Sequence, residues 1–528
     1  MTSLTVVVFI LPTWVAPLAY TSNLMSSNVG WSRVSASLSL LFYPGGGLGD
    51  SIVSLPVLYA IHEFFDGWAD IDIVTGQNIE ALRELYYGIP FVGDIVPCPP
   101  GAESVLAESY DAMVVANEQV VLQVKDKAQA YISDFVACVE SGWKRRDAFG
   151  LANRVHNLLN NQLANHAVLL GLDRRSLPLY SMGMPNYHET MPAMQLHPGA
   201  LDVLERHGLV AGQYITLQDG WDANFPLKTL DTRPTKVWPA AAWAALVVEI
   251  RARHPNMKIV QLGSAKTGGD IAGVDLNLRG KASLRDALAL LKFAALHVDT
   301  EGGLVHMARG LHTRCVVLFG PTNAKFFGYA RNKNLVPPCH NCWWMIQDWM
   351  SECLRGLDVP ECMTHHTPAA VANAVSEILA ENPAPRAAAR YGAVPLPSSP
   401  GTIGVANNAA LAMQFSAAGH AIIHFDLLQQ KNIQRPLDGM AYRQFVARPS
   451  NLPVENQILD QLHFTADANA NEFAGELLEA LGVMKVGGQA VIHITAAARD
   501  ATAAAFAKAN LPPPAGEPAE TIILARTA

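Results

Sequence analysis

The sequence predicts an α/β protein with two parallel sheets covered by helices, followed by a smaller α/β module. Short apolar runs of strand length alternate with segments whose apolar residues recur at helical spacing. This alternation covers residues 39–116, restarts at 214 and continues to 381. A stretch rich in Pro, Ala and Ser at 383–400 is typical of a linker, and the alternation resumes after it in residues 401–528.

The first region opens with a strand, a glycine-rich turn and a helix. Ser39–Tyr43 is predicted as a buried strand, Pro44–Gly49 as the turn, and Ser51–Phe65 as a helix. The further elements expected are strand Asp70–Val74, helix Asn78–Tyr87, strands Val92–Val96 and Ala112–Ala116, and a polar helical region Lys125–Leu172. This order predicts a parallel sheet covered by helices in a Rossmann-like domain, 38–200.

The second region, 201–382, repeats the pattern. The expected strands are Tyr214–Leu217, Lys258–Leu262, Leu296–Asp299 and Arg314–Phe319, and the expected helices are Ala240–Arg253, Ser283–Phe293, Leu304–Arg309 and Ala369–Glu381. Thr367-Pro368 supplies an N-cap and a first-turn proline for the last of these helices. A second Rossmann-like domain follows from this pattern.

Composition excludes a general nucleic-acid binder. Of the 528 residues half are hydrophobic, enough for two or three domain cores, and 38 basic residues face 46 acidic ones for a net charge of -8. The basic clusters Lys144–Arg146 and Arg174-Arg175 could be docking points for an anionic acceptor. Solvated helix faces are commoner, so that interpretation is favoured for both clusters.

Residues 1–37 are interpreted as an N-terminal extension without a fixed structure. Leu4–Tyr20 is apolar, but it lacks a basic start and contains Pro12 and Pro17, so a membrane anchor is the minority interpretation. A cytoplasmic location is expected on these grounds.

Two segments carry residues suited to chemistry. Asp50 follows the glycine-rich turn, where it serves either as an N-cap or as a functional carboxylate. The second segment, 296–306, is a strand that ends in acidic and hydroxyl residues, with two glycines opening a helix that carries His306. Because ligands of open α/β sheets bind at the carboxyl ends of strands, this segment is favoured as a site over a histidine buried in the core.

The motifs along the chain are Gly49-Asp50 with Leu55-Pro56, Lys236-Val237-Trp238-Pro239, Leu278 to Leu284, Glu301-Gly302-Gly303 with His306-Met307-Ala308, Phe319-Gly320-Pro321-Thr322, Phe327-Gly328-Tyr329, and a cysteine-rich stretch ending in Cys362-Met363. In order and spacing they resemble glycosyltransferase family 9, the group of ADP-heptose:lipopolysaccharide heptosyltransferases. The resemblance covers residues 39–381.

This resemblance implies the GT-B architecture, with the donor nucleotide held mainly by the second Rossmann-like domain and the acceptor mainly by the first. It also implies inverting transfer without a catalytic metal. Asp50 would be the base, Lys236 would neutralise the diphosphate, and the amides around Gly302 and Gly303 would cradle it. The other expected donor-binding residues are Asp299, Thr300, Glu301 and His306, and Gly47 and Gly49 belong to the expected acceptor and phosphate loop.

Two departures from the family pattern concern the donor. Family members often have a histidine five positions after an Asp-Thr-Gly aspartate, whereas seven positions separate Asp299 from His306. Glu301-Gly302-Gly303 is therefore a candidate equivalent. The loop Gly263–Lys266 lacks the acidic residue expected at the donor ribose, for which Asp270 is a candidate substitute.

Four cysteines are crowded into one short segment, with two, ten and eight residues between successive members: Cys339, Cys342, Cys353 and Cys362. Thiolates at such density suggest a structural zinc or iron site, and the alternative is a set of reduced thiols packed under nearby tryptophans. Some members of the family that glycosylate proteins carry a comparable cysteine finger. The resemblance to the family therefore includes this segment.

The region 401–528 resembles a worn class I methyltransferase fold. Lys485–Gln489 looks like its hairpin region before a late strand, but the loop Ala406–Ala409 lacks the glycines that a nucleoside cofactor needs. A noncatalytic interaction module is therefore favoured over an active methyltransferase.

The function expected is transfer of a heptose or related sugar from a nucleotide sugar, with ADP-heptose favoured, to a lipopolysaccharide, another surface glycan, a lipid-linked saccharide or a protein. The alternatives are a GT-B scaffold without turnover and a bifunctional glycosyltransferase and methyltransferase. Peripheral association with the inner membrane and homo-oligomer formation stay open, and no nucleic-acid partner is expected.

Overall fold

The computed structural model describes most of the chain after residue 37. The described residues are 38–65, 68–76, 79–89, 91–98, 103–117, 120–148, 160–184, 194–221, 234–381, 386–391, 402–406, 421–426, 442–446, 459–465, 470–494, 498–515 and 521–527. The predicted extension 1–37 and most of the predicted linker 383–400 lie outside these residues.

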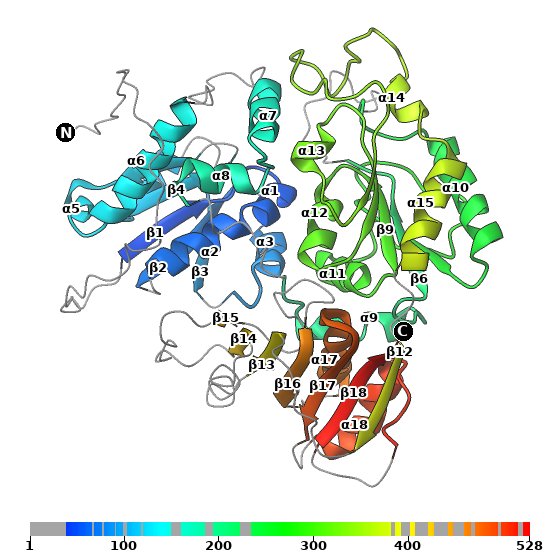
Figure 1. Ribbon diagram of the computed structural model, residues 1–528. Helices are drawn as coiled ribbons and strands as arrows, with labels where there is room; N and C mark the ends of the chain where they lie inside the picture. The colour runs from blue at the N-terminus through cyan, green and yellow to red at the C-terminus, as the bar shows by residue number, and fades with distance from the viewer. Residues whose placement is uncertain are drawn as a thin grey trace. The chain divides into compact units, whose positions relative to one another are not determined.

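The first sheet has the predicted parallel strands with one addition. Its strand order is β3-β2-β1-β4-β5, and β5 pairs antiparallel with β4 at one edge. The strands are β1 (Leu38–Tyr43), β2 (Ala69–Thr75), β3 (Val92–Pro97), β4 (Ala112–Ala116) and β5 (Val120–Val124). The predicted first Rossmann-like sheet is confirmed in blue and cyan in Figure 1, and β5 was missed because its residues lie just before a helical pattern.

The helices of this domain include a break that the sequence pattern did not show. The predicted helix Ser51–Phe65 is two helices, α1 (Leu48–Val53) and α2 (Leu55–Phe64), separated at Ser54. Pro56 causes the break, because it has no amide hydrogen to continue the helical ladder. The other helices are α3 (Ile79–Leu85), α4 (Glu103–Ala107), α5 (Asp126–Gln129), α6 (Ser133–Ala148), α7 (Asn160–Leu169) and α8 (Ser176–Ser181).

The second sheet is parallel at each of its strand pairs, in the order β11-β10-β9-β6-β7-β8. Its strands are β6 (Tyr214–Gln218), β7 (Lys258–Leu262), β8 (Leu276–Asn277), β9 (Leu296–Thr300), β10 (Cys315–Leu318) and β11 (Lys333–Leu335). The order reverses between β6 and β9, so the expected ligand crevice lies at the carboxyl ends of these two strands. The helices are η3 (Pro198–Ala200), α9 (Val203–Arg206), α10 (Ala240–Arg253), α11 (Leu284–Lys292), α12 (Gly303–Gly310), α13 (Ala324–Phe327), α14 (Glu361–Thr364) and α15 (Pro368–Glu381).

The third sheet begins inside the predicted linker, which corrects that boundary. Residues Arg386–Tyr391 form strand β12, which pairs antiparallel with β18 at the sheet edge. The strand order is β12-β18-β17-β16-β13-β14-β15. The remaining strands are β13 (Thr402–Ala406), β14 (Ala421–Asp426), β15 (Tyr442–Val446), β16 (Leu459–Thr465), β17 (Met484–His493) and β18 (Thr521–Thr527), with helices α17 (Ala470–Val483) and α18 (Arg499–Lys508).

The sequence Lys485–Gln489, interpreted above as a hairpin region, lies within strand β17. The apolar faces of α17 and α18 pack with β16, β17 and β18 in a core cluster that includes Leu462, Leu477 and Phe506. In the described part of the chain, no helix is both long and apolar enough to cross a membrane.

Candidate functional site

Asp50 is fixed by the glycine-rich turn that precedes it. Gly45 has a positive φ of 104°, and a Cβ there would lie 2.9 Å from the Asp50 Cβ, so the turn requires glycine at this point. The Gly47 amide donates to Asp50 Oδ2 at 3.0 Å. Asp50 is thus not the N-cap of α1 but its third residue, and its carboxylate folds back onto the N-cap, Gly47.

A buried arginine holds the other oxygen of the same carboxylate. Arg174 Nη2 lies 3.0 Å from Asp50 Oδ1 and donates to Asn117 Oδ1 at 2.5 Å. The Arg174 side chain is 4% exposed, whereas that of Asp50 is 36% exposed. The carboxylate is therefore held on its protein side and open on another.

The loop with Asp50 packs directly against the start of α12 in the second domain. A Cβ at Gly49 would lie 2.9 Å from His306 Cδ2 and 3.4 Å from Gly303 Cα. An alanine at this position would force the buried His306 ring to move, because its Cβ would be closer to the ring than an ordinary contact allows. The structure thus brings together the two segments that the sequence marked as chemical.

The residues expected to bind the donor form a continuous polar chain. Lys236 Nζ donates to the Glu301 carbonyl oxygen at 2.8 Å and lies 3.5 Å from Glu301 Oε2. The other carboxylate oxygen of Glu301 is 3.5 Å from His306 Nε2, and His306 Nδ1 is 2.6 Å from the Tyr329 hydroxyl. Lys236, Glu301 and His306 are all buried, so each constrains the next.

The electrostatics of Glu301 are set by its neighbours. Burial raises the pKa of this carboxyl, but the Lys236 ammonium and the hydrogen bond to His306 outweigh burial and lower its pKa to about 2. Glu301 is therefore ionised, and its negative charge offsets the positive charge of Lys236.

Asp299 and Thr300 occupy different surroundings at the end of β9. The carboxylate of Asp299 is buried and lies 3.3 Å from His297 Nε2, whose Nδ1 is 3.0 Å from Thr216 Oγ1. Burial raises the pKa of Asp299. This side chain is buried against His297, whereas Thr300 ends the strand and leads to Gly302, the N-cap of α12, which has extended backbone.

The expected ribose position is occupied by an ion pair. Arg279 Nε lies 3.1 Å from Asp270 Oδ1, and Arg279 Nη1 donates to the carbonyls of Ser264 and Ala265. Asp270 thus lies beside the loop Gly263–Lys266 that follows β7. This position is required if Asp270 replaces the acidic residue that the loop lacks.

Sequence reasoning missed the partners of the predicted residues. Arg174 was interpreted as surface or docking charge, and Asn117 was not singled out. Asn117 directly follows the end of β4, and that position at a carboxyl edge is the signal that could have identified it. The partner of an arginine, by contrast, cannot be inferred from local sequence, since Arg174 and Asp50 are far apart in the chain.

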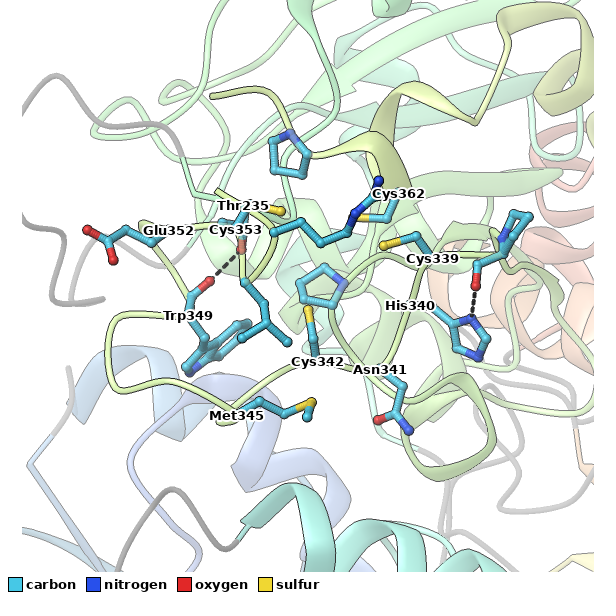
Figure 2. A pocket seen from close by; sticks show the side chains of 15 residues that line it. Thr235, Cys339, His340, Asn341, Cys342, Met345, Trp349, Glu352, Cys353 and Cys362 are labelled. Carbon is cyan, nitrogen blue, oxygen red and sulfur yellow. Dashed lines mark hydrogen bonds between the residues drawn. The ribbon is translucent and has the colours of Figure 1, made fainter. Parts of the chain in front are cut away.

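The four cysteines lie around one pocket of about 220 Å³ (Figure 2). They are free thiols. Burial raises the pKa of Cys362 to about 12, and the thiols of Cys339, Cys342 and Cys353 add to the shift. The four cysteines therefore lie close together, as their spacing in the sequence predicted.

Their arrangement differs from a ligand shell. Among the described residues, no group of three or more histidine, cysteine, aspartate or glutamate side chains is placed to hold a metal ion. A structural zinc or iron ion at these cysteines stays a prediction from the sequence.

The same loop supports the lysine of the donor side. The Thr235 amide donates to the Met350 carbonyl at 2.8 Å, and Thr235 Oγ1 donates to the Trp349 carbonyl at 2.7 Å (Figure 2). Thr235 immediately precedes Lys236, so the cysteine-rich loop fixes the backbone from which that side chain extends.

The family model described as Glycosyltransferase family 9 (heptosyltransferase) matches residues 226–355. That segment contains Lys236, Glu301 and His306, whereas Asp50 lies outside it. A search of curated proteins found no match.

Solved structures give distant likenesses. ADP-heptose LPS heptosyltransferase II of E. coli is 16% identical, with 66% of this chain and 100% of that chain covered and a TM-score of 0.41. A family 9 glycosyltransferase of Veillonella parvula is 14% identical, with 65% and 97% covered and a TM-score of 0.40. The iron-containing dodecameric glycosyltransferase TibC of enterotoxigenic E. coli is 13% identical, with 66% and 78% covered and a TM-score of 0.43.

The two sheets, parallel except for β5 at the edge of the first, agree with the expected GT-B architecture, as does the contact of α1 in the first domain with α12 in the second. The family match falls on the second of these domains and on the residues that converge at its carboxyl edge. Residues 226–355 therefore resemble glycosyltransferase family 9, and this match indicates a glycosyltransferase.

Proposed function

We propose that this protein transfers a heptose or related sugar from a nucleotide sugar to an acceptor hydroxyl, with inversion at the anomeric carbon. The observation that carries the proposal is the convergence of the Asp50 loop on the segment Glu301–His306. One segment offers a carboxylate for the acceptor, and the other, with Lys236, offers positive charge for the leaving group.

The reaction requires charge compensation at two places. As the acceptor oxygen bonds to the anomeric carbon, its proton passes to Asp50, and the bond from that carbon to the diphosphate breaks with its electrons on the diphosphate. Lys236 is the cation proposed to stabilise this leaving group. No metal is assigned a part in this step.

The start of α12 provides a second source of positive potential. Gly302, its N-cap, has no side chain that could cap the helix. The amides of the first turn can therefore serve an anion, as helix N-termini do for phosphates. Asp299, buried against His297, is proposed to support this loop from beneath, and Thr300, Gly302 and Gly303 to face the donor.

The identity of donor and acceptor belongs to this proposal as well. ADP-heptose is the favoured donor, and the acceptor is a lipopolysaccharide, another surface glycan, a lipid-linked saccharide or a protein. Solved structures of the E. coli heptosyltransferase WaaC that are similar to this chain contain ADP and ADP-2-deoxy-2-fluoro heptose. A cytoplasmic site of action, peripheral membrane association and homo-oligomer formation are proposed from the sequence.

For residues 386–527 we propose an interaction module. Its sheet is parallel except where β18 runs antiparallel to its neighbours. The resemblance to a class I methyltransferase stays a prediction, and binding of S-adenosylmethionine by the full chain would overturn the noncatalytic assignment.

The test is a panel of nucleotide sugars, including ADP-heptose, incubated with the purified full chain while nucleotide diphosphate release is measured. We expect saturable turnover with one donor class. If no donor binds or turns over, the protein is a GT-B scaffold and the proposed function is wrong.

A further inference from the structure

The turn that begins α8 contacts both halves of the proposed site. It consists of Asp173, Arg174, Arg175 and Ser176. Asp173 Oδ1 accepts hydrogen bonds from the Arg175 amide at 3.0 Å and from the Ser176 amide at 2.9 Å. These bonds fix the backbone from which the two arginines extend.

Arg174 joins the two domains through its backbone and side chain. Its amide donates to the Phe326 carbonyl of α13 at 2.9 Å, whereas its guanidinium bonds Asp50 and Asn117 of the first domain. Arg175 lies beside it, with its guanidinium carbon 5.0 Å from the centre of the Tyr329 ring.

We propose that Arg174 is a positioning residue for the Asp50 carboxylate, an inference that rests on the proposed glycosyl transfer. The Gly47 amide holds Oδ2 and Arg174 holds Oδ1, so the plane of the carboxylate is fixed at both oxygens. Because the Arg174 amide is bonded to α13, this alignment depends on contact between the two domains.

The consequence concerns the reaction step and not donor binding. The acceptor proton passes to Asp50 as the new glycosidic bond forms and the bond to the diphosphate breaks, so a misdirected carboxylate slows this step. Lys236 is held separately, because its Nζ donates to the Glu301 carbonyl oxygen. Arg174 thus acts on turnover and leaves donor affinity alone.

The experiment compares Arg174→Lys and Arg174→Gln with Arg314→Gln. Arg314 is a matched control: its side chain is 13% exposed and is paired with Glu381, at the opposite end of β10 from the site. We expect kcat to fall about 10- to 100-fold in Arg174→Gln, with a partial recovery in Arg174→Lys and donor KM within about threefold of wild type. Arg314→Gln should lower Tm without lowering kcat.

A double-variant cycle on thermal stability supplies a readout that does not need turnover. We expect the Tm loss of Arg174→Gln with Asp50→Asn to be smaller than the sum of the two single losses, because both remove one contact. Additive losses, or a kcat within twofold of wild type in Arg174→Gln, would overturn the assignment. A wild type without turnover would instead refute the proposed function, while the cycle would still decide whether Arg174 holds Asp50.

Discussion

Glu301 is an ionised carboxylate among the residues expected to bind the donor. It lies between Lys236 and His306, and its side chain is 9% exposed. The low pKa of this carboxyl means that folding favours its ionised form over the protonated one. The contribution to stability is fully present above the ordinary pKa of glutamate and is lost as pH falls toward about 2.

We therefore expect Glu301→Gln to flatten the acid limb of the stability profile. Wild type should lose on the order of 3 kcal/mol of unfolding free energy between about pH 5 and pH 2 that the variant does not lose. Urea unfolding at several pH values measures this difference. Parallel profiles for wild type and variant would contradict the assigned ion pair.

The candidate functional residues that belong to a family motif could be predicted from the sequence. The residues that hydrogen-bond to them could not. Asp50, Lys236, Glu301 and His306 were identified by resemblance, and the structure brings them to adjoining segments. The role of Arg174 could be identified only from its tertiary contacts. The local sequence around an arginine does not show whether its partner is a distant carboxylate or the solvent.

The approach of α1 to α12 depends on one glycine. A Cβ at Gly49 would meet His306 and Gly303, whereas a Cβ at Gly46 in the same loop would find only the Tyr43 hydroxyl, at 4.0 Å. We expect Gly49→Ala to lower stability by about 1–3 kcal/mol, since overpacking forces the helices apart, and to lower turnover at least tenfold.

Gly46→Ala is the control for that prediction, and its stability and turnover should stay close to those of wild type. Differential scanning calorimetry and the diphosphate-release assay measure both variants. Equal behaviour of the two variants would show that the helices do not meet at Gly49.

The cysteine-rich loop reaches the donor side through Thr235. We expect Thr235→Val to cost about 1–3 kcal/mol, because the Trp349 carbonyl loses its buried donor, and to weaken donor binding by loosening the backbone at Lys236. Thr313→Val is the matched control, since Thr313 Oγ1 makes a similar buried bond to the Leu291 carbonyl away from the site. Calorimetric titration with donor should separate the two variants. Unchanged donor affinity in Thr235→Val would contradict the support assigned to this loop.

Most strands and helices of the first two domains followed from periodicity, because buried parallel strands read as short apolar runs. Strand β12 did not, since Arg386–Tyr391 has a composition like that of a linker and gains its place only by pairing with β18, the last strand of the chain. Such long-range pairing leaves no local pattern.

The third module is joined to the second domain by a buried ion pair. Lys292 at the end of α11 contacts Glu479 of α17, with side chains 9% and 4% exposed. We expect Lys292→Met to cost about 3–5 kcal/mol, because it removes the cation from a buried carboxylate, and the added Glu479→Leu to recover most of that loss. Thermal unfolding of the two variants tests this, and equal Tm values for Lys292→Met and the double variant would contradict the pairing.

The central claim is that Asp50 and Lys236 divide the reaction between acceptor and leaving group. The most direct measurement is donor binding by titration calorimetry alongside transfer rate, for wild type, Asp50→Asn and Lys236→Met. We predict that Asp50→Asn binds donor like wild type but loses transfer by about a thousandfold or more, while Lys236→Met loses donor affinity as well. Full transfer by Asp50→Asn, or unchanged donor affinity and transfer in Lys236→Met, would contradict the account.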